Sequence, residues 1–142
     1  MKKKIIIFLL VVIVLFCLAI KLVSDHKVKQ NNMKAFNKEF DVYEKEISVS
    51  ELVTIIHKAI NSNDNNRVEE DENHYYIENT TNSIKIDVKF LQSDDVFKME
   101  KLYKNDLNKL AELYATQKFK CKEIKYHKST GFIKYLYFEE LE

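Results

Sequence analysis

The sequence predicts an α+β protein in which an N-terminal transmembrane helix precedes a small antiparallel sheet of two hairpins, packed with about three helices. Three observations lead to this fold class. An uncharged apolar run fills most of the first 23 residues. Several later segments place apolar residues at the three- and four-residue spacing of helices, and others alternate apolar with polar residues as strands do. We therefore expect two parts, a membrane anchor over residues 1–23 and a soluble α+β domain over residues 24–142.

The opening segment, MKKKIIIFLLVVIVLFCLAIKLV, is predicted to be an uncleaved membrane anchor. Its apolar run is longer than the roughly 7–15 residues of a signal-peptide core. When Lys21 extends its ammonium group to the lipid headgroups, the apolar stretch reaches Val23 and is long enough to span a bilayer. A cleaved signal peptide is the alternative, but the small residues that cleavage requires, around Ala19, lie inside the apolar run. We expect residues 5–23 to contact the membrane.

The placement of the lysines predicts how this anchor is oriented. Lys2, Lys3 and Lys4 form a compact cluster, whereas the lysines after the apolar run are spread out. Clustered lysines next to a span stay on the cytoplasmic side. We expect a single-pass protein of the cell membrane, with its N-terminus inside and its soluble domain extracytoplasmic. Inverted insertion, with a cytoplasmic domain, is the alternative.

The first half of the soluble domain is predicted to be helical. Residues 24–48 place apolar side chains on one helical face, and they form either a stalk or a helix that packs on the domain. Ser48 and Glu51 have the spacing of a capping box, so a second helix is expected to begin there.

The second half is predicted to contain two hairpins separated by a third helix. HYYIENTTNSIKIDVKFL alternates as strands do, with ENTTN as its turn. The spacing of the leucines predicts a helix over residues 99–117. KFKCKEIKYHK and GFIKYLYFEE form the final hairpin, in which Gly131 can supply the positive φ of the turn. Apolar residues change parity after Cys121, which predicts a β-bulge in the first strand of this hairpin.

Charge and composition exclude several functional classes. Four of the 23 Lys and Arg residues lie in the first 23 positions, which contain no acid, so residues 24–142 carry 19 basic and 22 acidic side chains. This near balance gives no reason to expect nucleic acid as a partner. Gly131 is the only glycine. Glycine-rich phosphate loops, dinucleotide fingerprints and nucleophile elbows are therefore excluded.

Three stretches, SELVTIIHKAINSNDNN, YYIENTTNSIKIDVKF and IKYHKSTGFIKYLYFEE, resemble a group of small single-span envelope proteins of low-GC Gram-positive bacteria, chiefly clostridia. Together they cover most of the soluble part. The resemblance implies an anchored, extracytoplasmic domain, and it implies no mechanism because the matching stretches contain no catalytic signature.

One polar segment, NSNDNNRVEEDE, has the spacing of a calcium-binding loop. Asn61, Asn63 and Asn65 stand at positions one, three and five, and Glu72 stands at the bidentate twelfth position. The first ligand is Asn instead of Asp, the glycine of the sharp turn is missing, and a strand-like segment follows. Two interpretations are open: a weak calcium loop, and a solvated asparagine-rich connection.

Two features of the last hairpin predict an interaction surface. Lys118, Lys120 and Lys122, which we call the lysine row, either contact an anionic partner or shield an edge strand against aggregation. Tyr135 and Tyr137 belong to a strand with aromatic residues on both faces, so one face either contacts a partner or is covered by a helix.

The sequence therefore predicts a membrane-anchored interaction module that binds a protein or an envelope polymer. It contains no catalytic or cofactor motif, and its histidines do not stand at the spacing of a zinc pair. We expect no cofactor, and the missing motifs favour a protein that is not an enzyme without deciding that question. The alternative is an extracytoplasmic sensor or enzyme whose site, such as a weak calcium site, forms only in the tertiary structure.

Overall fold

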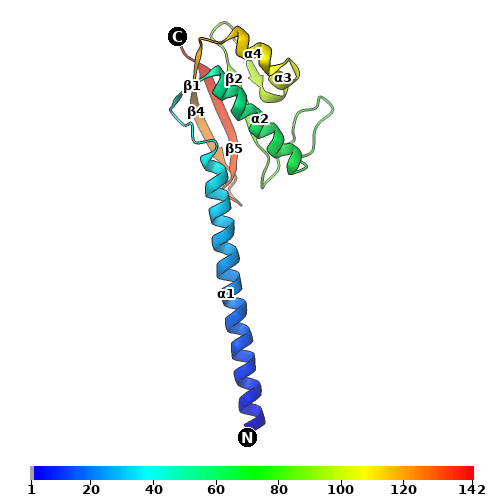
Figure 1. Ribbon diagram of the computed structural model, residues 1–142. Helices are drawn as coiled ribbons and strands as arrows, with labels where there is room; N and C mark the ends of the chain where they lie inside the picture. The colour runs from blue at the N-terminus through cyan, green and yellow to red at the C-terminus, as the bar shows by residue number, and fades with distance from the viewer. Residues whose placement is uncertain (1) are drawn as a thin grey trace. The chain divides into compact units, whose positions relative to one another are not determined.

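The computed structural model describes residues 2–142 and confirms the predicted α+β class, with a long apolar helix followed by a five-stranded sheet and further helices (Figure 1). The chain divides into two compact units between Phe36 and Asn37. The first unit is helical, and the second contains the sheet and its core. The apolar run predicted as an anchor lies entirely in the first unit.

Helix α1 spans Lys2–Lys38 without interruption. It contains no Gly or Pro, the residues that most strongly break helices. The helix is long and apolar enough to cross a membrane. Its apolar side chains between Ile6 and Val23 are exposed, as a lipid-facing surface requires. The helix predicted within residues 24–48 is the continuation of α1, and it ends before Phe40, whose side chain is buried in the core of the second unit.

The second unit is built on a mixed sheet with the strand order β1-β4-β5-β2-β3. Its strands are β1 (Glu46–Ser48), β2 (Lys85–Lys89), β3 (Val96–Lys98), β4 (Lys118–Tyr126) and β5 (Ile133–Glu140). The central strands β2 and β5 pair in parallel, and the other neighbouring strands pair antiparallel. The predicted antiparallel arrangement is therefore corrected at the β2–β5 pair.

The final hairpin forms as predicted. β4 and β5 pair antiparallel, and Gly131 adopts a φ of 75° in the turn between them. The register of β4 shifts between Cys121 and Glu123, which is the predicted β-bulge. Because of this shift, Cys121 and Ile124 lie opposite Phe138 and Leu136, on the same face of the sheet.

The predicted hairpin over residues 74–91 does not form. β2 begins only at Lys85, and its antiparallel partner is β3. The backbone N–H of Tyr76 donates to the carboxylate of Glu100 at 3.1 Å. The side-chain oxygen of Asn79 accepts hydrogen bonds from three of the next four backbone N–H groups. Side chains thus take the hydrogen bonds that a hairpin ladder would have used.

Three helices cover one face of the sheet: α2 (Val49–Asn65), α3 (Met99–Lys104) and α4 (Leu107–Leu113) (Figure 1). α2 begins with the predicted capping box. Ser48 Oγ accepts from the backbone N–H of Glu51, and the Glu51 carboxylate accepts from the backbone N–H of Ser48. The stripe of α2 that faces the sheet is apolar and buried, as its helical spacing predicts.

The single helix predicted over residues 99–117 is two short helices, because Asn105 and Asp106 interrupt it. Asp106 has a φ of 72°, outside the helical region, and its carboxylate accepts from the backbone N–H of Asn108 at 2.9 Å. This hydrogen bond makes Asp106 the N-cap of α4. A local side-chain cap therefore overrides the helical spacing of the leucines.

The core of the second unit lies between the helices and the sheet face that they cover. Buried strand side chains on this face are Ile86, Val88, Phe119, Cys121, Leu136 and Phe138. The opposite face carries charged side chains and half-buried tyrosines. This division follows the period-two alternation of strands that have one face buried.

Candidate functional site

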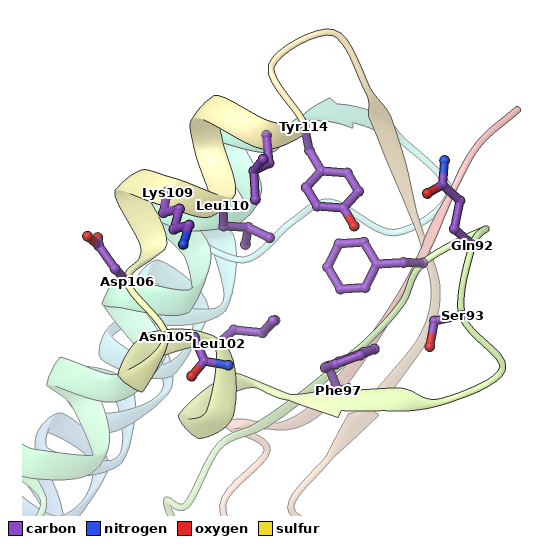
Figure 2. Close-up of a pocket in the computed structure, with 11 residues that line it drawn as sticks. Gln92, Ser93, Phe97, Leu102, Asn105, Asp106, Lys109, Leu110 and Tyr114 are labelled. Carbon is purple, nitrogen blue, oxygen red and sulfur yellow. The ribbon is translucent and has the colours of Figure 1, made fainter.

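A groove beside the sheet edge is the candidate functional site (Figure 2). It is formed by the end of β2, the β2–β3 turn, β3, and helices α3 and α4. Its volume is about 550 Å³, within the roughly 300–1,000 Å³ that is usual for ligand-binding pockets. The break between α3 and α4 supplies part of its wall, since both Asn105 and Asp106 line it.

The floor of this groove is aromatic. The ring centroid of buried Phe90 lies 4.7 Å from that of Tyr114 and 5.4 Å from that of Phe97. Leu102 and Leu110 project from the helices toward these rings (Figure 2). Aromatic pairs at such distances are worth about 0.5–1.5 kcal/mol beyond their buried area. The rings therefore hold one another in place on the floor of the groove.

The rim of the groove is polar. Gln92 and Ser93 lie on one side, and Asn105 and Lys109 lie on the other (Figure 2). Amide, hydroxyl and ammonium groups can hydrogen-bond the backbone of a bound segment, while the aromatic floor receives its apolar side chains. The groove thus suits a chain that carries a large apolar residue.

Exposed apolar residues and an open strand edge adjoin the groove. Leu91 and Val96 are about half exposed, and Leu113 is 69 % exposed. β3 is the last strand in the sheet order, so within residues 2–142 no strand pairs with its outer side. Such an edge presents backbone groups to which a strand of another chain can add.

The predicted contact tyrosines lie on the face of the sheet opposite to the helices. The Tyr135 hydroxyl donates to Asp87 Oδ2 at 3.0 Å, and the Lys125 ammonium group lies 4.8 Å from the centre of the Tyr135 ring. Burial raises the pKa of both Tyr135 and Tyr137. They stay neutral hydroxyl groups at physiological pH, and their role as contact residues stays a prediction.

The lysine row lies next to β1 and is partly neutralised. The Lys120 ammonium group is 2.7 Å from a carboxylate oxygen of Glu44. β4 is not an edge strand here, because Lys118 and Lys120 pair with residues of β1. The interpretation that the lysine row shields an edge is therefore wrong for Lys118 and Lys120. Lys122 lies at the bulge and is exposed.

The calcium-loop interpretation is wrong as well. Asn61, Asn63 and Asn65 lie in α2 instead of a loop, and Glu72 lies beyond the helix. The buried amide of Asn63 donates to the Ile84 carbonyl and accepts from the Ile84 N–H, both at 2.8 Å. This side chain is therefore used for packing. Among the described residues, no three His, Cys, Asp or Glu side chains form a group that could hold a metal ion.

A second, polar cavity of about 410 Å³ lies between α2, α3 and the loop that follows α2. The Tyr76 hydroxyl donates to Asp64 Oδ1 at 2.5 Å, and His74 Nδ1 lies 3.1 Å from Glu70 Oε2. Glu100 is only 6 % exposed, and burial raises its pKa even though the Tyr76 N–H donates to it. The sequence did not indicate this cluster, because its members come from distant segments with no motif spacing.

Glu100→Gln is expected to stabilise the protein at neutral pH. The pKa of Glu100 is raised in the folded state, so the protonated side chain favours folding. Its contribution to the free energy of unfolding is complete below the ordinary glutamate pKa of 4.5, and it is lost as pH rises through the folded-state pKa. At pH 7 the ionisable carboxyl group of Glu100 is unfavourable in its buried place, whereas the carbonyl oxygen of a Gln amide is uncharged and accepts the same hydrogen bond from the Tyr76 N–H. We expect an increase in unfolding free energy of about 1 kcal/mol at pH 7, and a much smaller one at pH 4.

Urea titrations of the full chain in mild detergent, followed by tyrosine fluorescence, measure this difference. The chain has no Trp, and all eight tyrosines lie between Tyr43 and Tyr137, so the signal reports only the second unit. Glu112, an exposed carboxylate on α4, gives the control variant Glu112→Gln. Equal stability of wild type and Glu100→Gln at pH 7 would contradict the expectation.

No protein-family model, no curated protein and no solved structure matches the chain. The resemblance to small single-span envelope proteins stays a prediction. Fold and site together define a class: a small α+β domain that follows a long apolar helix and carries an apolar groove at its sheet edge.

Proposed function

We propose that the protein is a membrane-anchored interaction module of the cell envelope. Its N-terminal helix spans the membrane with the lysine cluster inside, and its α+β domain binds an apolar segment of a partner protein outside the cell membrane. The observation that carries this proposal is the groove with an aromatic floor and a polar rim beside the open edge of β3. This geometry suits binding by contact and needs no catalytic group.

The chemistry of the groove defines the segment that it would take. A leucine or aromatic side chain fits against Phe90 and Tyr114, and an extended backbone can add to β3. Burying one such side chain contributes about 1.5–3 kcal/mol, so two or three contacts of this size suffice for a specific complex. The tyrosines of β5 and the lysine row are a separate polar surface of the same module.

Tyr114→Ala is expected to abolish partner binding at the groove, because it removes the Tyr114 ring from the aromatic floor. A photo-crosslinking amino acid at exposed Lys109 in the full chain is expected to give one defined adduct in cells, reduced at least about tenfold by Tyr114→Ala, since tenfold corresponds to only about 1.4 kcal/mol. The same crosslinker at exposed Asn61 on α2 is the control. Adducts of equal intensity and identity from both positions would contradict the proposed groove function.

Cysteine labelling tests the proposed orientation. Cys121 is fully buried, and burial raises its pKa to about 11, so it contributes little background labelling. In a Cys17→Ser chain, a cysteine at Asn61 is expected to react with a membrane-impermeant maleimide in intact cells. Labelling only after permeabilisation would place the domain in the cytoplasm, and a labelled chain that lacks its first residues would show cleavage.

A second candidate function, a sensor or enzyme, is favoured by the cavity around Glu100. The buried carboxyl group of Glu100 has a raised pKa and lies in the same cavity as the Tyr76–Asp64 pair. A buried ionisable group lowers the free energy of unfolding at neutral pH, and proteins keep such destabilising groups mainly at functional sites. This candidate predicts that the Glu100→Gln variant is more stable than wild type but inactive. Expressed in a strain that lacks the protein, the variant is then expected not to restore its function. Full restoration would reject it.

A further inference from the structure

Helix α3 is the wall between the aromatic groove and the polar cavity around Glu100. Leu102 lines the groove, whereas Glu100, Tyr103 and Lys104 line the polar cavity. Residues two apart are turned about 200° around a helix axis, so Glu100 and Leu102 project from opposite sides of α3. Figure 2 shows Leu102 projecting toward the groove floor. Any displacement of α3 therefore changes both cavities.

α3 is held in place mainly by its side chains. It has only six residues, Met99–Lys104. The chain leaves the helical path at Asp106, which has a φ of 72°. A helix of this length is not stable by its own backbone hydrogen bonds. Its position thus depends on the buried side chain of Leu102 and on the Glu100 carboxylate, which accepts the Tyr76 N–H at 3.1 Å.

Glu100 is buried without a counter-ion. It is only 6 % exposed, and within residues 2–142 no salt bridge joins it to a basic side chain. Burial raises its pKa, and the positive charges of Lys98 and Lys85 only partly offset this effect. The ammonium group of Lys104 donates instead to the Asn73 carbonyl at 3.1 Å. An ionised Glu100 is therefore unfavourable while α3 is packed in this position. The charged and titratable groups around it are Asp64 of α2, Glu70, His74 and Tyr76 of the following loop, Tyr103 and Lys104 of α3, Lys98 of β3 and Lys85 of β2.

We propose that ionisation of Glu100 regulates the aromatic groove by loosening α3. This regulation rests on the proposed binding function of the groove, and it couples that site to the surrounding pH. A protonated Glu100 fits its buried position, so α3 stays packed and Leu102 and Asn105 complete the groove wall. An ionised carboxylate favours a position with more water, which α3 reaches only by leaving its packed position. Protonation of Glu100 and occupancy of the groove therefore favour each other, and binding weakens as Glu100 ionises with rising pH.

Hydrogen exchange of the full chain in dodecyl maltoside tests this coupling without a partner. Rates at pH 5 and pH 8 are corrected for the exchange of unstructured peptides at each pH. We expect the peptide that contains residues 99–106 to lose protection at least about tenfold at pH 8, because each pH unit above the pKa of an ionising group can change the equilibrium up to about tenfold. Glu100→Gln is expected to show the same protection at both pH values.

Two variants show whether Glu100 is the group responsible. Glu112→Gln removes an exposed carboxylate of α4, and His74→Gln removes the imidazole that lies 3.1 Å from Glu70 in the polar cavity. Histidine commonly titrates between pH 5 and pH 8, so His74 is the alternative to Glu100. We expect both variants to keep the wild-type pH dependence. A pH dependence that persists in Glu100→Gln, or that disappears in His74→Gln, would overturn the proposal.

The photo-crosslink at Lys109 separates this regulation from the groove function itself. In intact cells we expect the wild-type adduct to fall at least about threefold between external pH 5 and pH 8, while Glu100→Gln gives the same yield at both. An adduct that Tyr114→Ala abolishes, with the same pH dependence in wild type and Glu100→Gln, would reject the regulation and keep the groove function. The expected exchange of α3, with an adduct that Tyr114→Ala leaves unchanged, would keep the Glu100 switch in α3 and reject the groove function.

Discussion

Replacement of Asn63 by Ala is expected to lower the free energy of unfolding of the soluble unit by about 3 kcal/mol or more. The Asn63 amide is fully buried and satisfies both the carbonyl and the N–H of Ile84 at 2.8 Å. The methyl group of Ala leaves two buried backbone groups without a partner, and each costs about 1–3 kcal/mol. These groups lie next to the start of β2, so the loss weakens the contact between α2 and the sheet.

Asn61→Ala is the matched control for this prediction, since Asn61 lies on the same helix with its side chain exposed. We expect that variant to stay within about 0.5 kcal/mol of wild type. Urea unfolding followed by tyrosine fluorescence compares the two. Similar stabilities for both variants would show that the Asn63 hydrogen bonds contribute little.

Two arginines in the apolar run are expected to release the protein from the membrane fraction. Val12 and Leu15 lie near the middle of the run. A charged residue at the centre of a spanning helix costs about 2.5–3.5 kcal/mol, so Val12→Arg with Leu15→Arg costs about 5–7 kcal/mol of insertion free energy. The measurement is the share of full-length chain that stays with membranes after alkaline carbonate washing.

Two arginines placed beyond the apolar run are the control for added charge. Val28→Arg with Gln30→Arg lies on exposed positions of α1, and we expect full membrane retention. Retention of the Val12→Arg, Leu15→Arg chain as well would mean that another part of the protein holds it to the membrane, and residues 5–23 would then lose their proposed role as anchor.

Local sequence signals predicted the elements that depend on local physics. The apolar run of α1, the capping box at Ser48, the Gly131 turn and the bulge after Cys121 are each determined by residues a few positions apart. Periodicity also separated the buried side chains of β4 from its lysines. These features follow from backbone geometry and alternation, which a single sequence displays directly.

Predictions failed where a side chain hydrogen-bonds outside its own segment. The Glu100 carboxylate accepts from the N–H of Tyr76, which was predicted to lie in a strand of the hairpin that does not form. The Asn63 side chain bonds the backbone of Ile84, and Asn63 lies in α2 instead of the predicted loop. The hydrogen bonds of Glu100 and Asn63 depend on tertiary partners, about which periodicity contains no information. The break at Asp106 has a different, local cause, because its carboxylate accepts from the N–H of Asn108 and caps a helix inside a continuous apolar pattern.

The candidate groove was beyond prediction for a related reason. Its floor combines Phe90 from the end of β2, Phe97 from β3 and Tyr114 from the end of α4. Each residue matches the apolar pattern of its own element and reads as an ordinary core residue. The one local signal was the polar pair Asn105–Asp106 within a helical pattern, which marks the break that shapes the groove wall.

The parallel pairing of β2 with β5 also determines when the domain can fold during synthesis. β5 lies between β4 and β2 in the sheet, yet it is the last strand along the chain. Until Ile133–Glu140 has emerged from the ribosome, no strand pairing joins β2 and β3 to β4 and β1, and the sheet lacks its central strand. Closing contacts over such separations is slow. The sheet of the second unit can therefore be completed only after β5 has been made, so β2 and β4 both wait for a central strand that follows them in the chain.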